Sequence, residues 1–308
     1  MAEQFTRISP AVTLCHESFG ERSDPPLVLV MGLGTQMVAW HDDFCLELAR
    51  RGFHVTRFDN RDVGRSTHHD FQPPTLAQLF IRRLPPGQYA LEDMAGDLAA
   101  LIDALDLGPA HIVGASMGGM IAQVLAAERP EQVRSLVSIM SNTGSRVSGQ
   151  PALSVYRHFL KEAPQEREAF VEHVARLFSL IGSTKLGANV DEVREVARRS
   201  FDRGHDPAGA GRQLGAIAKT GNRTPMLRRI SVPTLVIHGT HDRLVRTSGG
   251  RATARAIHGA RLELIEGMGH DLPRAAWPRM LDGIVANARR ADRRAAASAR
   301  PRAQTQAA

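Results

Sequence analysis

A serine between two glycines is the first group in the sequence with the chemistry of a nucleophile. Ser116 is the central residue of Gly-Ala-Ser-Met-Gly, which begins at Gly114 and ends at Gly118. A strand-like run ends just before this motif, and a helical stretch, residues 117–128, begins just after the serine. A serine at so sharp a turn has an exposed hydroxyl, and the glycines remove side chains that would collide across it. The motif therefore predicts a serine nucleophile rather than a bystander in a glycine-rich turn.

Position selects the base that this serine needs. A serine hydroxyl is a weak nucleophile until a base takes its proton, and the chain has 13 histidines. His270 ends the loop Glu-Gly-Met-Gly-His, directly after a strand-like run at residues 261–265. The carboxyl edge of an open α/β sheet is where ligands bind, so we predict His270 as the base. His68 and His69 fall in a polar loop and His238 falls within a strand, so none of these three is favoured.

Asp242 is the carboxylate that suits the third role, which is to orient the base and stabilise its charged form. It follows the strand-like run 233–238 and so lies at the same edge of the sheet. The end of the strand before the helical insertion offers only Ser-Asn-Thr, residues 141–143, with no carboxylate. The alternative is that Asp242 only caps the following helix. The order serine, aspartate, histidine is that of the α/β-hydrolases and differs from both protease orders.

Two backbone N–H groups complete the predicted site as an oxyanion hole. One belongs to Met117, the residue after the nucleophile, and the other to a loop that follows an early strand. We assign the second to Leu33, because Gly32 and Gly34 on either side would let the backbone approach a substrate.

Alternating strand-like and helix-like segments must position these groups. The run 27–31 has no polar alternation, as expected for a parallel strand covered on both faces. The predicted strands are 12–15, 27–31, 53–58, 111–114, 133–140, 233–238 and 261–265, and the predicted helices are 44–49, 93–107, 117–128, 253–257 and 276–287. This alternation predicts an α/β fold, with a mostly parallel sheet and helices on both faces.

The segment 144–229 interrupts this alternation with helical stretches and no strong strand run. We interpret it as a helical cap inserted into a core made of residues 1–143 and 230–287. The Ala/Arg-rich end, residues 288–308, has no apolar periodicity and is predicted to be disordered.

The composition of the 308 residues is that of an ordinary globular protein, with 43% hydrophobic and 23% charged residues. Two cysteines are too few for a disulfide framework or a zinc cluster, and we expect neither a metal nor a cofactor. The first residues lack a signal-peptide pattern. The longest apolar run is far shorter than the ~20 residues of a membrane span. We therefore expect a cytoplasmic protein with no membrane span.

The formal net charge of +7 raises the question of a polyanionic partner. The end of the chain, residues 288–308, carries six arginines and one aspartate, and the segment 144–229 has 15 basic and 9 acidic residues. The remaining core is therefore mildly acidic. The basic end has no aromatic side chain to stack on bases, so we expect no nucleic-acid partner. We predict instead that a positive cap favours anionic substrates by steering them.

Four motifs together resemble one group of α/β-hydrolases: Val-Met-Gly-Leu-Gly at 30–34, the stretch 59–66, the serine turn, and Gly-Met-Gly-His at 267–270. Over about residues 19–289 the chain is similar to the aclacinomycin methylesterase-like and lipase G-like carboxylesterases. The resemblance implies an α/β-hydrolase fold with a helical cap and no cofactor. It carries the family's nucleophile, acid, base and oxyanion donors onto Ser116, Asp242, His270, Leu33 and Met117.

The chain departs from the broader fold at Met31, where many members have histidine. This change leaves the backbone donor in place but makes the first oxyanion loop apolar. The stretch 59–66 is expected to brace the site rather than take part in the reaction, because its residues are typical of turns.

The resemblance and the residues predict a serine carboxylic ester hydrolase with a small-molecule ester substrate, apolar or anionic. Lactonases, thioesterases and C–C hydrolases use the same groups and stay open as alternatives, and a ligand-binding protein with an unused site is a more distant one. No amine-binding carboxylate pair stands out in the cap, which argues against a peptidase; the acidic residues considered are Glu162, Glu166, Glu168 and Glu172. Aromatic and leucine side chains of the cap line an acyl pocket or, as we favour, form the cap's own core; they are Tyr156, Phe159, Phe170, Leu177, Phe178 and Phe201.

Overall fold

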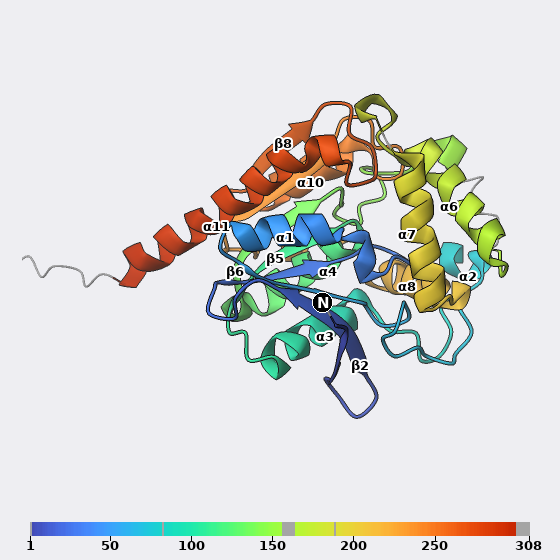
Figure 1. Ribbon diagram of the computed structural model, residues 1–308, viewed down its shortest axis with the longest axis horizontal. Helices are drawn as coiled ribbons and strands as arrows, with labels where there is room; N and C mark the ends of the chain where they lie inside the picture. The colour runs from blue at the N-terminus through green and yellow to red at the C-terminus, as the bar shows by residue number, and fades with distance from the viewer. Residues whose placement is uncertain (1, 82, 156–163, 188, 300–308) are drawn as a thin grey trace, which may run out of the picture.

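The computed structural model describes residues 2–81, 83–155, 164–187 and 189–299 and arranges them around one eight-stranded sheet (Figure 1). The strand order is β1-β2-β4-β3-β5-β6-β7-β8, and only the pairs β1–β2 and β2–β4 are antiparallel. The strands are β1 (Gln4–Arg7), β2 (Thr13–Phe19), β3 (Pro26–Val30), β4 (His54–Phe58), β5 (Ala110–Ala115), β6 (Val133–Ile139), β7 (Thr234–Gly239) and β8 (Arg261–Ile265). The predicted mostly parallel sheet is confirmed, and β1 is an additional edge strand.

Helices cover both faces of the sheet, as the unbroken apolar runs of its central strands require. Every residue of β5 is buried, and β3 is buried after its first residue. One face packs against α1 (Asp42–Arg50) and α11 (Trp277–Ala299). The other face packs against α3 (Leu91–Ala104) and α4 (Met117–Glu128), with α10 (Thr247–Ala256) beside β7. A helix outside these layers, α2 (Leu76–Ile81), lies near α8 in Figure 1.

Helices fill the described part of the segment between β6 and β7, and they gather at one end of the molecule (Figure 1). They are α6 (Arg167–Ile181), the short η3 (Thr184–Leu186), α7 (Val190–Arg203), α8 (Pro207–Thr220) and α9 (Thr224–Leu227). Side chains that hydrogen-bond the first free N–H groups start two of them: Asn189 caps α7 and Asp206 caps α8. In α6 and α7, Phe170 and Phe201 lie 5.7 Å apart between ring centroids, whereas Tyr156 and Phe159 fall outside the described residues. We call residues 144–229 the cap.

The C-terminal segment corrects one expectation. Residues 288–299 are helical, since α11 continues to Ala299 and projects from the body of the molecule (Figure 1). Ala288 and Ala291 are buried against the sheet, and Arg290 donates to the carbonyl of Thr234 at 3.0 Å. Alanine and arginine favour helix, and small alanines pack without the large apolar side chains that a search for periodicity detects. The last residues, 300–308, lie outside the described part. No helix within the described ranges, α11 included, is long and apolar enough to cross a membrane.

Candidate active site

Ser116 stands at the junction of β5 and α4 in a strained backbone conformation, with φ of 54° and ψ of −118°. A positive φ is uncommon for a residue with a side chain, and such strain accumulates at functional sites. The Ser116 N–H donates to the carbonyl of Ile139 in β6 at 2.9 Å, which fixes the turn against the sheet. The side chain is half-buried at the carboxyl edge of the sheet.

Backbone crowding explains the glycines around this serine. A Cβ on Gly114 would lie 2.2 Å from the carbonyl oxygen of Gly118, and a Cβ on Gly118 would lie 2.1 Å from that of Val30. Neither distance is possible for a real side chain, so both positions require glycine. A Cβ on Gly32 would come within 3.1 Å of the Ser116 Cβ, which places the loop after β3 directly against the serine.

The structure brings the three predicted catalytic side chains into one hydrogen-bonded chain, although they come from positions up to 154 residues apart. Ser116 Oγ lies 3.0 Å from His270 Nε2, and His270 Nδ1 lies 2.7 Å from Asp242 Oδ2. A carboxylate only accepts hydrogen bonds, so the ring proton is on Nδ1 and Nε2 is free to accept from the serine hydroxyl. This is the geometry of a serine activated by an oriented base.

The carboxylate of Asp242 is fully buried and held on both oxygens. Oδ1 accepts the N–H groups of Leu244 and Val245 at 2.9 and 2.8 Å, and Oδ2 accepts from His270. His238 Nε2, in β7, lies 3.4 Å from the same Oδ2. Burial opposes ionisation, but the charge of His270 and the hydrogen bonds from both histidines outweigh it and keep the pKa of Asp242 below its usual range. The group is therefore a carboxylate at neutral pH.

The two N–H groups predicted for the oxyanion hole lie on elements that face the serine. Met117 is the first residue of α4, so its N–H has no carbonyl of a preceding turn to bind. Leu33 lies in the loop after β3, between Gly32 and Gly34. Gly34 has a φ of 62° and donates its N–H to Gln213 Oε1 in α8 at 2.8 Å. A cap helix thus fixes the loop that carries the predicted Leu33 donor.

The stretch 59–66 holds this loop from the other side. Asp59 Oδ1 accepts the N–H of Met37 at 2.7 Å, and Asn60 Nδ2 donates to the carbonyl of Met31 at 3.0 Å. Gln213 Nε2 reaches the same stretch and donates to the carbonyl of Arg61 at 2.7 Å. These contacts are the bracing that the turn-forming residues led us to expect.

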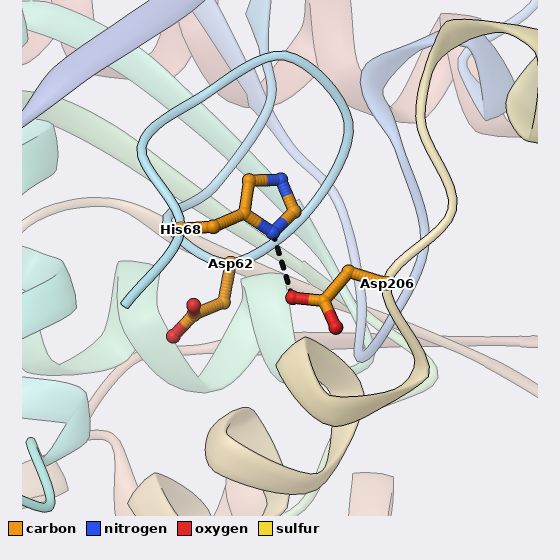
Figure 2. Close-up of side chains that lie close together, drawn as sticks. All are labelled: Asp62, His68 and Asp206. Carbon is orange, nitrogen blue, oxygen red and sulfur yellow. Dashed lines mark hydrogen bonds and ion pairs between the residues drawn. The ribbon is translucent and has the colours of Figure 1, made fainter. Parts of the chain in front are cut away.

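A second cluster of ligand-type side chains joins the stretch 59–66 to the cap: Asp62, His68 and Asp206 (Figure 2). His68 Nδ1 lies 2.8 Å from Asp206 Oδ2. Arg212 donates to that same oxygen at 2.6 Å and to Asp62 Oδ1 at 2.9 Å. A metal ion would have to displace this guanidinium from both carboxylates, so we assign the cluster to an ion-pair junction between cap and core.

Two residues that contact the site had no signal in the sequence. Gln213 is a buried glutamine within a helix, and nothing in its spacing indicates that it reaches both the loop after β3 and the carbonyl of Arg61. His238 has the sequence pattern of a strand residue and reaches Asp242 only because the loop after β7 folds back over the strand end.

Known proteins share this fold and its full extent. A family model described as alpha/beta hydrolase fold matches residues 25–273. The chain is 30% identical over 305 residues to the rhodomycin D methylesterase DauP of Streptomyces sp. (strain C5), and 28% identical to the rhodomycin D methylesterase DnrP of Streptomyces peucetius. Each alignment covers 91% of this chain and 96% of the relative.

Among solved structures, a hydrolase from Pseudomonas aeruginosa PA01 superposes with a TM-score of 0.70 at 26% identity. The superposition covers 93% of this chain and 97% of that one. The predicted resemblance to methylesterase-like α/β-hydrolases is confirmed, and the chain belongs to the α/β-hydrolase fold family.

Proposed function

We propose that this protein is a serine hydrolase that cleaves a carboxylic ester through an acyl-enzyme intermediate. The observation that carries the proposal is the hydrogen-bonded chain from Asp242 through His270 to Ser116 at the carboxyl edge of the sheet. The strained backbone of Ser116 and the glycines that permit it are expected of a nucleophile and unnecessary for an ordinary turn.

In the proposed reaction Ser116 Oγ attacks the ester carbonyl carbon while its proton passes to His270 Nε2. The N–H groups of Leu33 and Met117 hold the developing oxyanion, and Asp242 stabilises the imidazolium. The intermediate collapses, the bond to the alcohol oxygen breaks, and the alcohol leaves with the proton from His270. A water molecule then gives its proton to His270 and attacks the acyl carbon, which releases the acid and returns the proton to Ser116.

The proposed substrate is an ester of a small molecule, and the relatives named as methylesterases favour the ester of a small alcohol. The cap supplies little support for a peptidase among its described residues. Glu168 pairs with Arg167 at 2.6 Å, and Glu172 pairs with Arg194 at 2.8 Å. These carboxylates are therefore engaged within the cap, and Glu162 lies outside the described residues.

The test is the hydrolysis of a panel of methyl and p-nitrophenyl esters, lactones and thioesters by the wild type and by Ser116→Ala. We expect ester hydrolysis with a fall in kcat of about 10⁶ in the variant, as seen when a serine nucleophile is removed from a complete triad. Ser135→Ala is the matched control, because Ser135 is a buried serine of β6 that hydrogen-bonds His111 at 2.8 Å, outside the predicted site. Turnover of no ester by the wild type would refute the proposal, and faster turnover of lactones or thioesters would reassign the substrate class.

A further inference from the structure

The loop that carries the predicted base is attached to the cap, and the inference drawn from this attachment rests on the proposed function. This base loop, residues 267–271, lies against the junction of α6 and η3 at residues 181–186. The His270 N–H donates to the carbonyl of Ile181 at 2.7 Å, and the Gly269 N–H donates to Ser183 Oγ at 2.7 Å. Two consecutive backbone N–H groups of the base loop are therefore bound by the cap.

Ser183 binds the next residue of the loop as well. Its N–H donates to Asp271 Oδ2 at 3.1 Å, and its hydroxyl donates to Asp271 Oδ1. The Ser183 side chain is fully buried, and its oxygen accepts from Gly269 while its proton is given to Asp271. Burial raises the pKa of Asp271, which the hydrogen bonds from Ser183 and the charge of His270 offset only in part. One serine thus connects the residues on both sides of His270.

Close backbone contact makes this attachment stiff. A Cβ on Gly269 would lie 2.4 Å from the carbonyl oxygen of Ile181, and a Cβ on Gly182 would lie 2.5 Å from that of Phe178. With no side chain between the two segments, a displacement of the end of α6 is transmitted directly to the base loop.

The acid of the triad is held differently. Asp242 accepts its backbone hydrogen bonds from Leu244 and Val245 in its own loop, and its other neighbour, His238, belongs to the sheet. The core therefore places the acid, whereas the cap contacts the residues before, at and after the base. We propose that Ser183 and Asp271 are positioning residues that hold His270 in line with Ser116 and make the placement of the base depend on the seating of the cap.

The experiment compares Ser183→Ala, Ser183→Thr, Asp271→Asn and the double variant Ser183→Ala/Asp271→Asn with the wild type. For Ser183→Ala we expect kcat to fall about 10- to 100-fold with KM within about twofold, because a displacement of about 1 Å at a reacting group has this scale of effect. Ser183→Thr, which keeps the hydroxyl, should restore most of kcat. The double variant should lose little more than Ser183→Ala alone, because the two side chains act through one contact.

Hydrogen exchange supplies a readout that does not depend on turnover. The amides of Gly269 and His270 should exchange at least about tenfold faster in Ser183→Ala than in the wild type, since local opening governs their protection. Ser135→Ala, which loses a buried hydroxyl elsewhere, should change neither these amides nor kcat. Asp271→Asn keeps one acceptor oxygen, so it serves as the milder variant if Ser183→Ala fails to fold.

Loss of kcat together with faster exchange at Gly269 and His270 supports the proposal. Wild-type kcat in Ser183→Ala overturns it, whether or not exchange is faster, and so does a loss of kcat with unchanged exchange. If the wild type hydrolyses no ester, the proposed function fails, and the exchange comparison alone then supports or overturns the attachment of the base loop by Ser183.

Discussion

The carboxylate of Asp242 shows how individual residues define the site. Its two oxygens are saturated by two backbone N–H groups and two histidines, so it is held in one orientation and remains charged although it is buried. A residue that served only as a helix cap would need the contacts of Oδ1 alone. The additional contact of Oδ2 with His270 favours the role of triad acid.

We therefore expect Asp242→Asn to keep the fold and to lower kcat by about 10⁴, since an amide leaves the base in the wrong tautomer and cannot stabilise its charge. The measurement is kcat for the preferred ester, with urea unfolding as the check on stability. A loss of less than about tenfold would assign Asp242 to the capping role, and the acid would have to be sought elsewhere.

The elements of the core were accessible from the sequence because their signals are local. Helix α4 has the predicted bounds, residues 117–128, since a serine turn precedes it and Pro130 follows it. Strand β1 was missed because its four residues lie at an edge, where three of them are exposed and no apolar run forms. Ser183 and Gln213 were also missed, since their partners lie 86 and 179 residues away in the sequence.

The length of α11 leads to a prediction about this element. A chain ending at Asn287 loses the buried Ala288 and Ala291 and the hydrogen bond from Arg290 to β7, so we expect its Tm to fall by several degrees. A chain ending at Ala299 keeps all three and should melt like the full chain. Equal Tm values for the two truncated chains would show that the last turns of α11 contribute nothing to stability.

Charge is distributed over the whole molecule so that cap and core attract each other. Arg203 of α7 pairs with Asp59 at 2.7 Å and with Glu3 at 2.7 Å, and Arg199 pairs with Asp42 at 3.3 Å. Arg212 makes a similar contact at the junction shown in Figure 2. The positive excess of the cap is partly neutralised by the acidic core. The steering of anionic esters stays a prediction, and these paired arginines contribute less to it.

Burial separates two of these pairs into a matched test. The side chains of Arg203 and Asp59 are 7% and 0% exposed, whereas those of Arg199 and Asp42 are 42% and 50% exposed. Arg203→Gln leaves a buried carboxylate without its cation and should lower the free energy of unfolding by about 3–5 kcal/mol. Arg199→Gln should lower it by less than about 1 kcal/mol. Urea denaturation measures both, and equal losses would contradict the assignment of Arg203 as the main ionic attachment of the cap.

The two ends of the cap leave the sheet side by side, and this has a consequence for how such proteins diversify. Strands β6 and β7 are neighbours, with Ile139 opposite Ile237, so the cap begins and ends about 4.8 Å apart. An insertion at this point can be exchanged as a cassette without disturbing a strand. Here, however, the cassette supplies Ser183 to the base loop and Gln213 to the loop after β3. A transplanted cap would therefore bring a new substrate range only if it also carried counterparts of these two anchors.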